Sequence, residues 1–178
     1  MEIRYTKRIC TDTERIHTFL EQSRVGIVSM EAGEYPYAVP VNYVMMNECV
    51  YFHSAGSGKK TDILAQTPKV CFTVFEEIGT ETNPVPCHVD TAYMSVMIMG
   101  TAGRVEDTNE ATAALQRLLD KYLPGIFKQP LSPALVEKYR SSMDTKATAV
   151  FKIRPDILTA KENRVAPELL FGAHADSQ

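Results

Sequence analysis

The sequence predicts a mainly β protein, an antiparallel β-barrel with peripheral helices. Strand-like segments follow one another in hairpin-like runs instead of alternating strictly with helices, which disfavours a doubly wound parallel sheet. Segments such as 69–77 (KVCFTVFEE) alternate in polarity and are rich in β-forming residues. The chain has 178 residues, 44% of them hydrophobic, so one domain of ordinary size can bury a substantial core.

The N-terminal part is predicted to contain one helix and three strands. The stretch TDTE at 11–14 offers a capping box, and apolar residues recur at helical spacing after it until about Ser23. Pro40 cannot donate to a ladder, so it indicates an edge, a bulge or a place where pairing stops. Asn47-Glu48 is a plausible turn between the second and third strands. The three strands are predicted at 24–30, 37–46 and 49–55.

The rest of the chain continues this pattern. An irregular excursion is expected at 77–90, which contains two prolines and few long apolar side chains. Gly100 and Gly103 allow the next strand to bend or coil. The remaining predicted elements are a helix at 60–66, strands at 69–77 and 92–107, a helix capped by Asp107 or Thr108 and ended by Pro124-Gly125, a short helix starting at Ser132-Pro133, and a strand at 147–161. We expect one domain over 1–178, with its core at about 3–158 and a loosely held tail at 159–178.

Charge and composition narrow the class of protein. The net charge of −3 argues against a broad nucleic-acid surface, which is normally basic. No run approaches the roughly 18 to 20 apolar residues that cross a membrane, and the charged start MEIRYTKRIC lacks an apolar signal core, so we expect a cytoplasmic protein. The four cysteines are scattered without a CxxC pair, so we expect no zinc site and no disulfide, with Cys49 and Cys71 buried as small hydrophobes.

The most concentrated polar and basic stretch is YFHSAGSGKKTDIL at 51–64. It fails the P-loop pattern at both ends and lacks a GxGxxG fingerprint, which excludes nucleotide hydrolysis of the usual kind. Small residues before a helix start still allow backbone N–H groups to face an anion. Hydroxyls and charge for that anion come from Ser54, Ser57, Thr61, Lys59 and Lys60. From the loop alone, a solvated hairpin loop with surface lysines remains an equal alternative.

The wider segment resembles the pyridoxamine 5′-phosphate oxidase-like flavin proteins, most closely the branch of the 5-nitroimidazole antibiotic resistance proteins. The resemblance covers roughly residues 3 to 155. It departs from the family where Lys59-Lys60 replaces the more usual Arg-Lys pair, and the loop between Glu76 and Tyr93 is idiosyncratic. The motifs that carry it are Val39-Pro40-Val41-Asn42-Tyr43, Phe52-His53-Ser54-Ala55, Gly58-Lys59-Lys60, Thr67-Pro68, Val70-Cys71-Phe72 and the later strand YMSVMIMGTAGRVED.

This resemblance implies an FMN-binding split β-barrel that pairs as a homodimer, with the flavin in a cleft at the interface. The phosphate of FMN, or the proximal phosphate of FAD, then meets the basic loop, with Lys60 as the main cation. The resemblance names no catalytic residue, and His53 is the candidate. The supporting phosphate contacts are Lys59, Ser54 and Thr61, the contacts along the isoalloxazine or ribityl chain are His53, Ala55, Val41 and Asn42, and Ser95 completes the pocket.

The leading functional hypothesis is therefore a flavin-dependent oxidoreductase that passes electrons to a small-molecule acceptor. By analogy with the nitroimidazole branch, that acceptor is a nitroaromatic compound. The alternative is a non-catalytic protein that binds or sequesters flavin. Oxidation of pyridoxamine phosphate ranks below both, because a second phosphate site would require further Arg and His residues and no such cluster is visible. The excursion at 77–90 is expected to lie near the open face of the flavin and to influence substrate choice.

Overall fold

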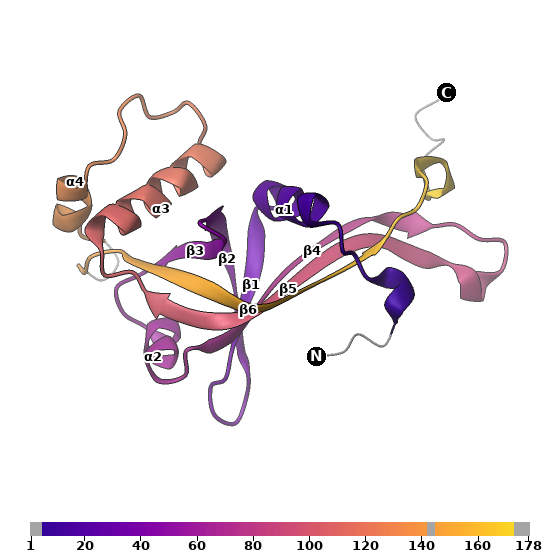
Figure 1. The fold of residues 1–178 in the computed structure, drawn as a ribbon, viewed down its shortest axis with the longest axis horizontal. Helices are drawn as coiled ribbons and strands as arrows, with labels where there is room; N and C mark the ends of the chain where they lie inside the picture. Colours follow the sequence, from indigo (N-terminus) through magenta and orange to yellow (C-terminus); the bar gives the residue numbers. More distant parts are fainter. Residues whose placement is uncertain (1–4, 142–144, 173–178) are drawn as a thin grey trace.

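The computed structural model describes residues 5–141 and 145–172 and contains a closed antiparallel barrel. Its strands are β1 (Val25–Met30), β2 (Tyr37–Met46), β3 (Cys49–Ser54), β4 (Lys69–Glu81), β5 (Asp90–Arg104) and β6 (Ala149–Asn163). Their order around the barrel is β1-β2-β3-β6-β5-β4, and β1 also pairs with β4, which closes it. The mainly β antiparallel barrel predicted from the sequence is confirmed (Figure 1).

The helices surround this barrel (Figure 1). The α-helices of the described residues are α1 (Thr13–Gln22), α2 (Lys59–Gln66), α3 (Thr108–Tyr122) and α4 (Pro133–Lys138), and short 3-10 turns are η1 (Thr6–Arg8), η2 (Pro86–His88) and η3 (Pro167–Leu169). Local sequence starts three of the α-helices: the side chains of Asp12, Asp107 and Ser132 each accept a hydrogen bond from the backbone N–H three residues later. The caps at Asp107 and Ser132 agree with the predicted helix starts, whereas the first helix is capped by Asp12 and not by Thr11 of the predicted capping box.

Aromatic and branched side chains fill the interior of the barrel. Its largest fully enclosed residues include Tyr43, Phe52, Phe72, Ile98 and Ile153. The rings of Tyr43 and Phe72 meet edge to face, with their centroids 4.9 Å apart. A Cβ atom at Gly26 would lie 2.1 Å from Cζ of Phe72, so only glycine leaves room for this ring. The interior is thus a packed core.

A second buried cluster lies outside the barrel, where α3 packs against β2, β3 and β6. Apolar residues of α3 cover Val44 and Tyr51 there. The hydroxyl of Tyr51 donates to Oε1 of Glu110 at 2.6 Å, and Nζ of Lys152 lies 2.8 Å from the same oxygen. These contacts fix α3 beside β3, the strand that leads into the basic loop.

Three local features occur as the sequence predicts. β2 pairs with β1 along its first half but with β3 only from Tyr43 onward, so Pro40 has a strand partner on one side alone. Asn47 and Glu48 both have positive φ, 50° and 59°, and form the two-residue turn between β2 and β3. The β5–β6 pairing shifts register at Gly100, which confirms the expected bend.

The prediction of an irregular excursion at 77–90 is wrong at both ends, because only 82–89 lie outside the strands. β4 continues to Glu81 and β5 begins at Asp90, and the two strands stay paired as an arm that projects beyond the barrel (Figure 1). We call residues 75–95 the β4–β5 arm. The glycine and prolines that suggested a loop do not end the pairing of the two strands. Gly79 lies at a register shift, and the prolines lie at the tip around η2. A glycine bulge interrupts a ladder without ending it.

The tail predicted at 159–178 also begins too early. β6 runs to Asn163, because the long strand β5 offers it a partner as far as Tyr93. Beyond β6, Leu170 forms a bridge with Glu81 of the β4–β5 arm. The chain up to Gly172 is therefore attached to the arm, and residues 173–178 of the predicted tail lie outside the described part of the structure.

Candidate functional site

The basic loop joins the end of β3 to the start of α2, and we call residues 54–61 the cradle. Gly58 precedes the helix with a φ of 130° and no side chain caps the helix there. The N–H groups of a first helical turn have no partner inside the helix, and they carry its partial positive charge. The hydroxyl of Thr61 donates its proton to the carbonyl oxygen of Gly58 at 2.6 Å. The lone pairs of this hydroxyl oxygen therefore remain at the start of the helix. The cradle has the backbone features of an anion site.

The two lysines of the cradle differ in their surroundings. Lys60 is half-buried, with its Nζ 5.3 Å from the ring centroid of Phe52, and burial lowers the pKa of Lys60. Lys59 is exposed, and its Nζ lies 4.6 Å from the ring centroid of Tyr37. Among residues 5–141 and 145–172, neither lysine forms an ion pair with a carboxylate. Both ammonium groups are thus placed to meet a negative ligand, and Lys60 would benefit more because it is further from water.

The structure adds a neighbour that sequence reasoning missed. A Cβ atom at Gly56 would lie 2.6 Å from the carbonyl oxygen of Ala147 and 2.7 Å from Cβ of Lys146. The segment before β6 therefore presses on the cradle, and Gly56 is required for this close approach. No local signal could have revealed the contact, since about 90 residues separate the two segments; the pairing of Ser54 with Ala149 creates it.

His53 precedes the cradle and points to the outside of the barrel. Its ring is partly exposed, yet the protein packed around it, and then the charge of Lys60, lower the pKa of His53 below its usual value. At neutral pH this imidazole is uncharged. Asn42 lies on β2 one residue beyond the pairing of Tyr43 with Phe52, which sets it across from His53, and it is exposed. Val41, by contrast, is buried.

Most of the predicted site residues are brought together by β2, β3 and α2, but Ser95 is not. Ser54 and Ala55 lie half-buried in the cradle beside His53. Ser95 pairs with Lys161 of β6, whereas Ser54 pairs with Ala149, so twelve β6 residues, roughly 40 Å along the strand, separate the two serines. Within one chain, Ser95 cannot contact a ligand of the cradle.

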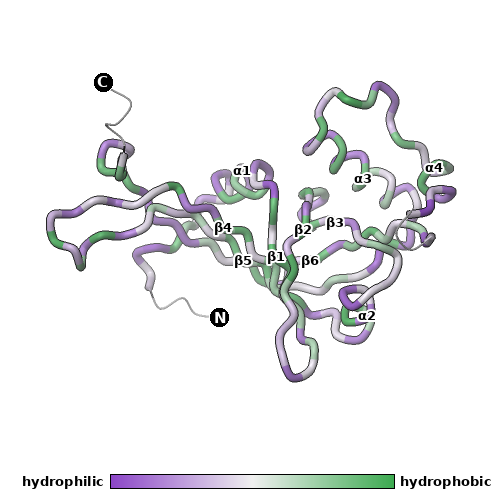
Figure 2. The backbone as a smooth tube through the Cα atoms, turned by 180° about the vertical axis from the view of Figure 1, so that it is seen from behind, coloured by the Kyte–Doolittle hydropathy of each residue, from purple (hydrophilic) through white to green (hydrophobic). Residues whose placement is uncertain are grey.

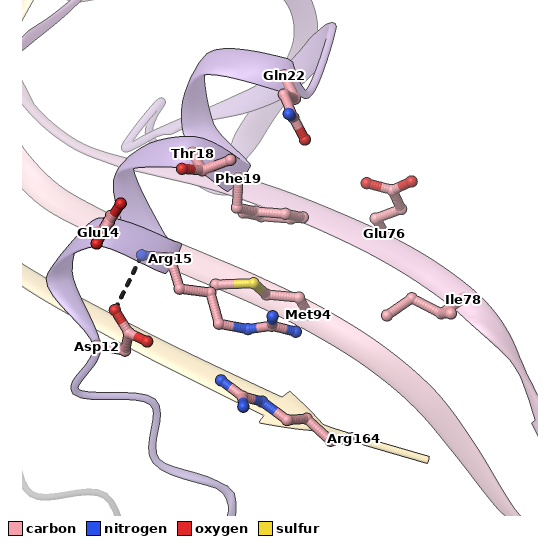
Figure 3. Close-up of a pocket in the computed structure, with 10 residues that line it drawn as sticks. All are labelled: Asp12, Glu14, Arg15, Thr18, Phe19, Gln22, Glu76, Ile78, Met94 and Arg164. Carbon is pink, nitrogen blue, oxygen red and sulfur yellow. Dashed lines mark hydrogen bonds between the residues drawn. The ribbon is translucent and has the colours of Figure 1, made fainter. Parts of the chain in front are cut away.

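One large cavity is separate from the cradle, and none of the described residues that line it is a predicted site residue. It has a volume of about 520 Å³ and lies between α1 and the strands at the base of the β4–β5 arm (Figure 3). Arg15 and Arg164 both extend along it, and Nε of each binds a different oxygen of Glu162, at 2.6 and 3.0 Å. Burial would raise the pKa of Glu162, but these hydrogen bonds lower it on balance. Both arginines are thus already paired with Glu162, and Arg15 connects α1 to β6.

A second cavity, of about 480 Å³, does reach the cradle end of β3. His53 lines it together with residues of α3, of α4 and of the segment between them. Figure 2 shows hydrophobic stretches on α3 and along this connecting segment. The cavity is an apolar space that opens next to an uncharged imidazole and a basic loop.

The described residues contain no group of three or more His, Cys, Asp or Glu side chains arranged to hold a metal ion. The cysteines are free; Cys10 is buried, whereas Cys49 and Cys71, expected to be buried, are only half-buried. No helix among the residues that the structure describes is long and apolar enough to cross a membrane.

A comparison of the sequence with the profiles of known protein families identifies the family of the chain. Residues 12–162 match the sequence profile of the pyridoxamine 5′-phosphate oxidase family. The chain belongs to this family. The resemblance seen in the sequence motifs is thereby confirmed, and the matched range includes the whole barrel up to the penultimate residue of β6. A search of curated protein sequences found no match.

Several solved structures are similar in fold to this chain. A putative 5-nitroimidazole antibiotic resistance protein from Bacteroides thetaiotaomicron is 26% identical, with a TM-score of 0.65 over 86% of this chain and 85% of that one. The flavocytochrome Anf3 from Azotobacter vinelandii is 20% identical, with a TM-score of 0.74 over 92% and 73%. An FAD and heme binding protein from Mycobacterium smegmatis is 17% identical, with a TM-score of 0.71 over 96% and 80%.

For this member of the pyridoxamine 5′-phosphate oxidase family, the geometry separates two capabilities. The cradle provides cations, hydroxyls and an uncapped helix start, which together suit a phosphate group. The neighbouring outer face of β3 provides an imidazole beside an apolar cavity, which suits a ring system or an apolar molecule. The cradle can therefore hold the phosphate of one ligand, while the cavity beside it can accept a separate ring system or apolar molecule.

Proposed function

We propose that this protein binds a flavin, FMN or FAD, and acts as a flavin-dependent oxidoreductase. The observation that carries the proposal is the cradle: in a chain of the pyridoxamine 5′-phosphate oxidase family, a half-buried lysine without a carboxylate partner among the described residues lies at an uncapped helix start. Structures of similar fold support it, because they include FAD-binding proteins from Mycobacterium smegmatis and Mesorhizobium loti. Bound flavin would supply the hydride and electron transfer chemistry.

The residues of the chain would bind and orient the flavin. Lys60 is the main phosphate cation, and Lys59, Ser54 and Thr61 support it with charge and hydroxyl groups. His53, Ala55, Asn42 and Val41 are proposed along the ribityl chain or the isoalloxazine. Because Val41 is buried and Asn42 is exposed, Asn42 offers the side-chain contact, while Val41 contributes its backbone and the packing beneath. His53 is the candidate for a catalytic hydrogen bond.

The flavin site is proposed to require two copies of the chain. Ser95 lies roughly 40 Å along β6 from the cradle of its own chain, so only a second protomer can bring a Ser95 to the same flavin. Apolar side chains stand exposed on the outer faces of the strands around Ser95, with Ile27 44%, Phe75 58% and Ile157 43% exposed. A two-fold homodimer that covers them would complete both sites at once.

We further propose that reduced flavin passes its electrons to a nitroaromatic acceptor. Similarity to the putative 5-nitroimidazole antibiotic resistance protein supports this acceptor. The neutral His53 beside an apolar cavity is consistent with an aromatic substrate and offers no charge for a second phosphate. A protein that only stores flavin would share the cradle but would show no turnover.

Two measurements test the proposal in sequence. The purified protein should be yellow, and heat should release a flavin that chromatography identifies as FMN or FAD. Under anaerobic conditions, NADH or NADPH should then be oxidised faster when a 5-nitroimidazole is present. Bound flavin without any acceptor-dependent turnover would favour the storage alternative, and a protein that neither retains nor takes up flavin would refute the proposal altogether.

A further inference from the structure

The apolar cavity beside His53 has its own walls and its own chemistry. Seven of the ten described residues that line it are leucine, valine or phenylalanine, contributed by α3, by α4 and by the segment between them. The other three are His53, Tyr139 and Thr148, so none of the described lining residues is Asp, Glu, Lys or Arg. Its volume of about 480 Å³ lies within the range of small-molecule sites, which is roughly 300–1,000 Å³.

The contrast with the other large cavity shows what this one excludes. Five of the ten described residues that line the cavity at α1 are charged, whereas none of those that line the cavity under α3 and α4 is. A phosphate or carboxylate placed among these leucines would lose its hydration without gaining a counter-charge, which is costly. An uncharged, mostly apolar molecule loses little hydration there and gains from the burial of its surface.

His53 supplies the polar end of the cavity. Its imidazole is uncharged at neutral pH, because burial and the charge of Lys60 lower the pKa of His53. A neutral imidazole has one donor and one acceptor nitrogen, so it can satisfy a single polar substituent such as a nitro or carbonyl oxygen. The next residue along the chain, Ser54, belongs to the cradle, so a molecule in the cavity would lie next to whatever the cradle holds.

We propose that this cavity is the binding site for an uncharged aromatic acceptor, of the nitroarene or quinone class, with its polar substituent at His53. The site discriminates against phosphorylated substrates, including pyridoxamine 5′-phosphate, even though the family takes its name from that compound. The position of the acceptor next to flavin rests on the proposed function, whereas the cavity itself is a feature of the structure. Helix α4 and the segment that precedes it form one wall of the site.

Equilibrium dialysis of the purified full-length protein tests the assignment, with duroquinone as the probe and no electron donor present. Duroquinone is uncharged and has no free ring position for attack by the cysteines. Its binding should be saturable, and a tenfold excess of pyridoxamine 5′-phosphate should not displace it. Leu135→Glu puts a carboxylate into the cavity wall at a side chain that is 55% exposed, and it should weaken binding at least tenfold.

The matched control is Leu123→Glu. Leu123 follows α3, is 46% exposed and does not line the cavity, so this variant should bind duroquinone within twofold of the parent. Thermal melts establish that both variants fold. Equal binding by Leu135→Glu and the parent, or displacement by pyridoxamine 5′-phosphate, would overturn the assignment. Uptake of haemin with a Soret band that His53→Ala abolishes would overturn it too, because His53 would then be a metal ligand.

The absorbance of flavin in the same samples separates this inference from the proposed function. Flavin-loaded protein that fails to bind duroquinone removes the cavity assignment and leaves the flavin proposal intact. Flavin-free protein that binds duroquinone, with loss in Leu135→Glu, supports the cavity and counts against the proposed function. The two measurements therefore distinguish failure of the cavity assignment from failure of the proposed flavin function.

Discussion

Replacing Lys60 with alanine is the most direct perturbation of the proposed flavin site. Lys60 is the half-buried cation of the cradle, its Nζ lies 5.3 Å from the ring centroid of Phe52, and burial lowers its pKa. A bound phosphate would compensate this ammonium group for the hydration that it loses on burial. Truncation of this side chain to alanine should not disturb the fold, since Lys60 lies at the first turn of α2 and is not part of the buried cluster of the barrel.

The size of the effect follows from the type of contact. A hydrogen bond between charged groups contributes about 1.5 to 3 kcal/mol, so Lys60→Ala should weaken FMN binding about ten- to a hundredfold. Lys59→Ala should cost less, about two- to fivefold, because the Lys59 side chain is exposed and its charge is screened by solvent. The control is Lys69→Ala, an exposed lysine shortly after α2 that pairs with Asp156 and lies outside the cradle. It should leave FMN affinity unchanged.

Fluorescence titration of flavin-free protein measures these dissociation constants at fixed ionic strength. Riboflavin, which lacks the phosphate, makes the assay specific: Lys60→Ala should change riboflavin binding less than twofold. The pH dependence has a defined sign, because the lowered pKa of Lys60 means that its charge is lost earlier as the pH rises. FMN affinity should therefore fall at alkaline pH while riboflavin affinity does not. If Lys60→Ala binds FMN as tightly as the parent, or loses FMN and riboflavin equally, the phosphate assignment is wrong.

Three further outcomes are expected. Gly26→Ala drives a Cβ into the ring of Phe72 and should destabilise the fold by about 3 kcal/mol in urea unfolding, whereas Gly103→Ala, with open space around it, should change stability by less than about 1 kcal/mol. Burial lowers the pKa of Lys121 to about 8 from 10.5, so the buried charge destabilises the folded state below pH 8, and this destabilisation disappears as the pH rises toward 10.5. Lys121→Met should therefore raise the free energy of unfolding by about 1 to 2 kcal/mol at pH 7. A gain in stability that persists unchanged at pH 10 would contradict this sign. Light scattering should give twice the chain mass of 19.9 kDa, and Phe75→Glu on the exposed sheet face should halve it; a parent protein that is monomeric with flavin bound would refute the shared site.

Signals that act over a few residues made much of the fold predictable. Asp107 and Ser132 cap the helices that they were expected to start, Asp12 caps the first helix one residue after Thr11 of the expected capping box, and a positive-φ turn occurs at Asn47-Glu48. The bend at Gly100 was predictable for the same reason, since a missing side chain affects the backbone at its own position. Each of these choices depends on sterics and hydrogen bonds between near neighbours in the chain.

The candidate site was predictable only in part. The sequence alone identified a polar, basic loop ahead of a helix, and the family motifs pointed to Lys60 and His53 within it. It could not distinguish the half-buried Lys60 from the exposed Lys59, because burial depends on what packs from elsewhere. Nor could it reveal that Ser95 lies roughly 40 Å along β6 from the cradle in the same chain, since that separation is set by the register of β6.

By itself, the sequence determined the antiparallel barrel, the positions of its helices and the chemical character of the loop at 54–61. Only the tertiary structure decided that 77–90 is the end of a paired arm, that residues 146–147 press on Gly56, and that His53 opens into an apolar cavity under α3 and α4. The physical reason is that barrel closure pairs strands far apart in the chain, as when β3 meets β6. Such pairings are selected by the whole core at once, so no local pattern encodes which side chains they bring together.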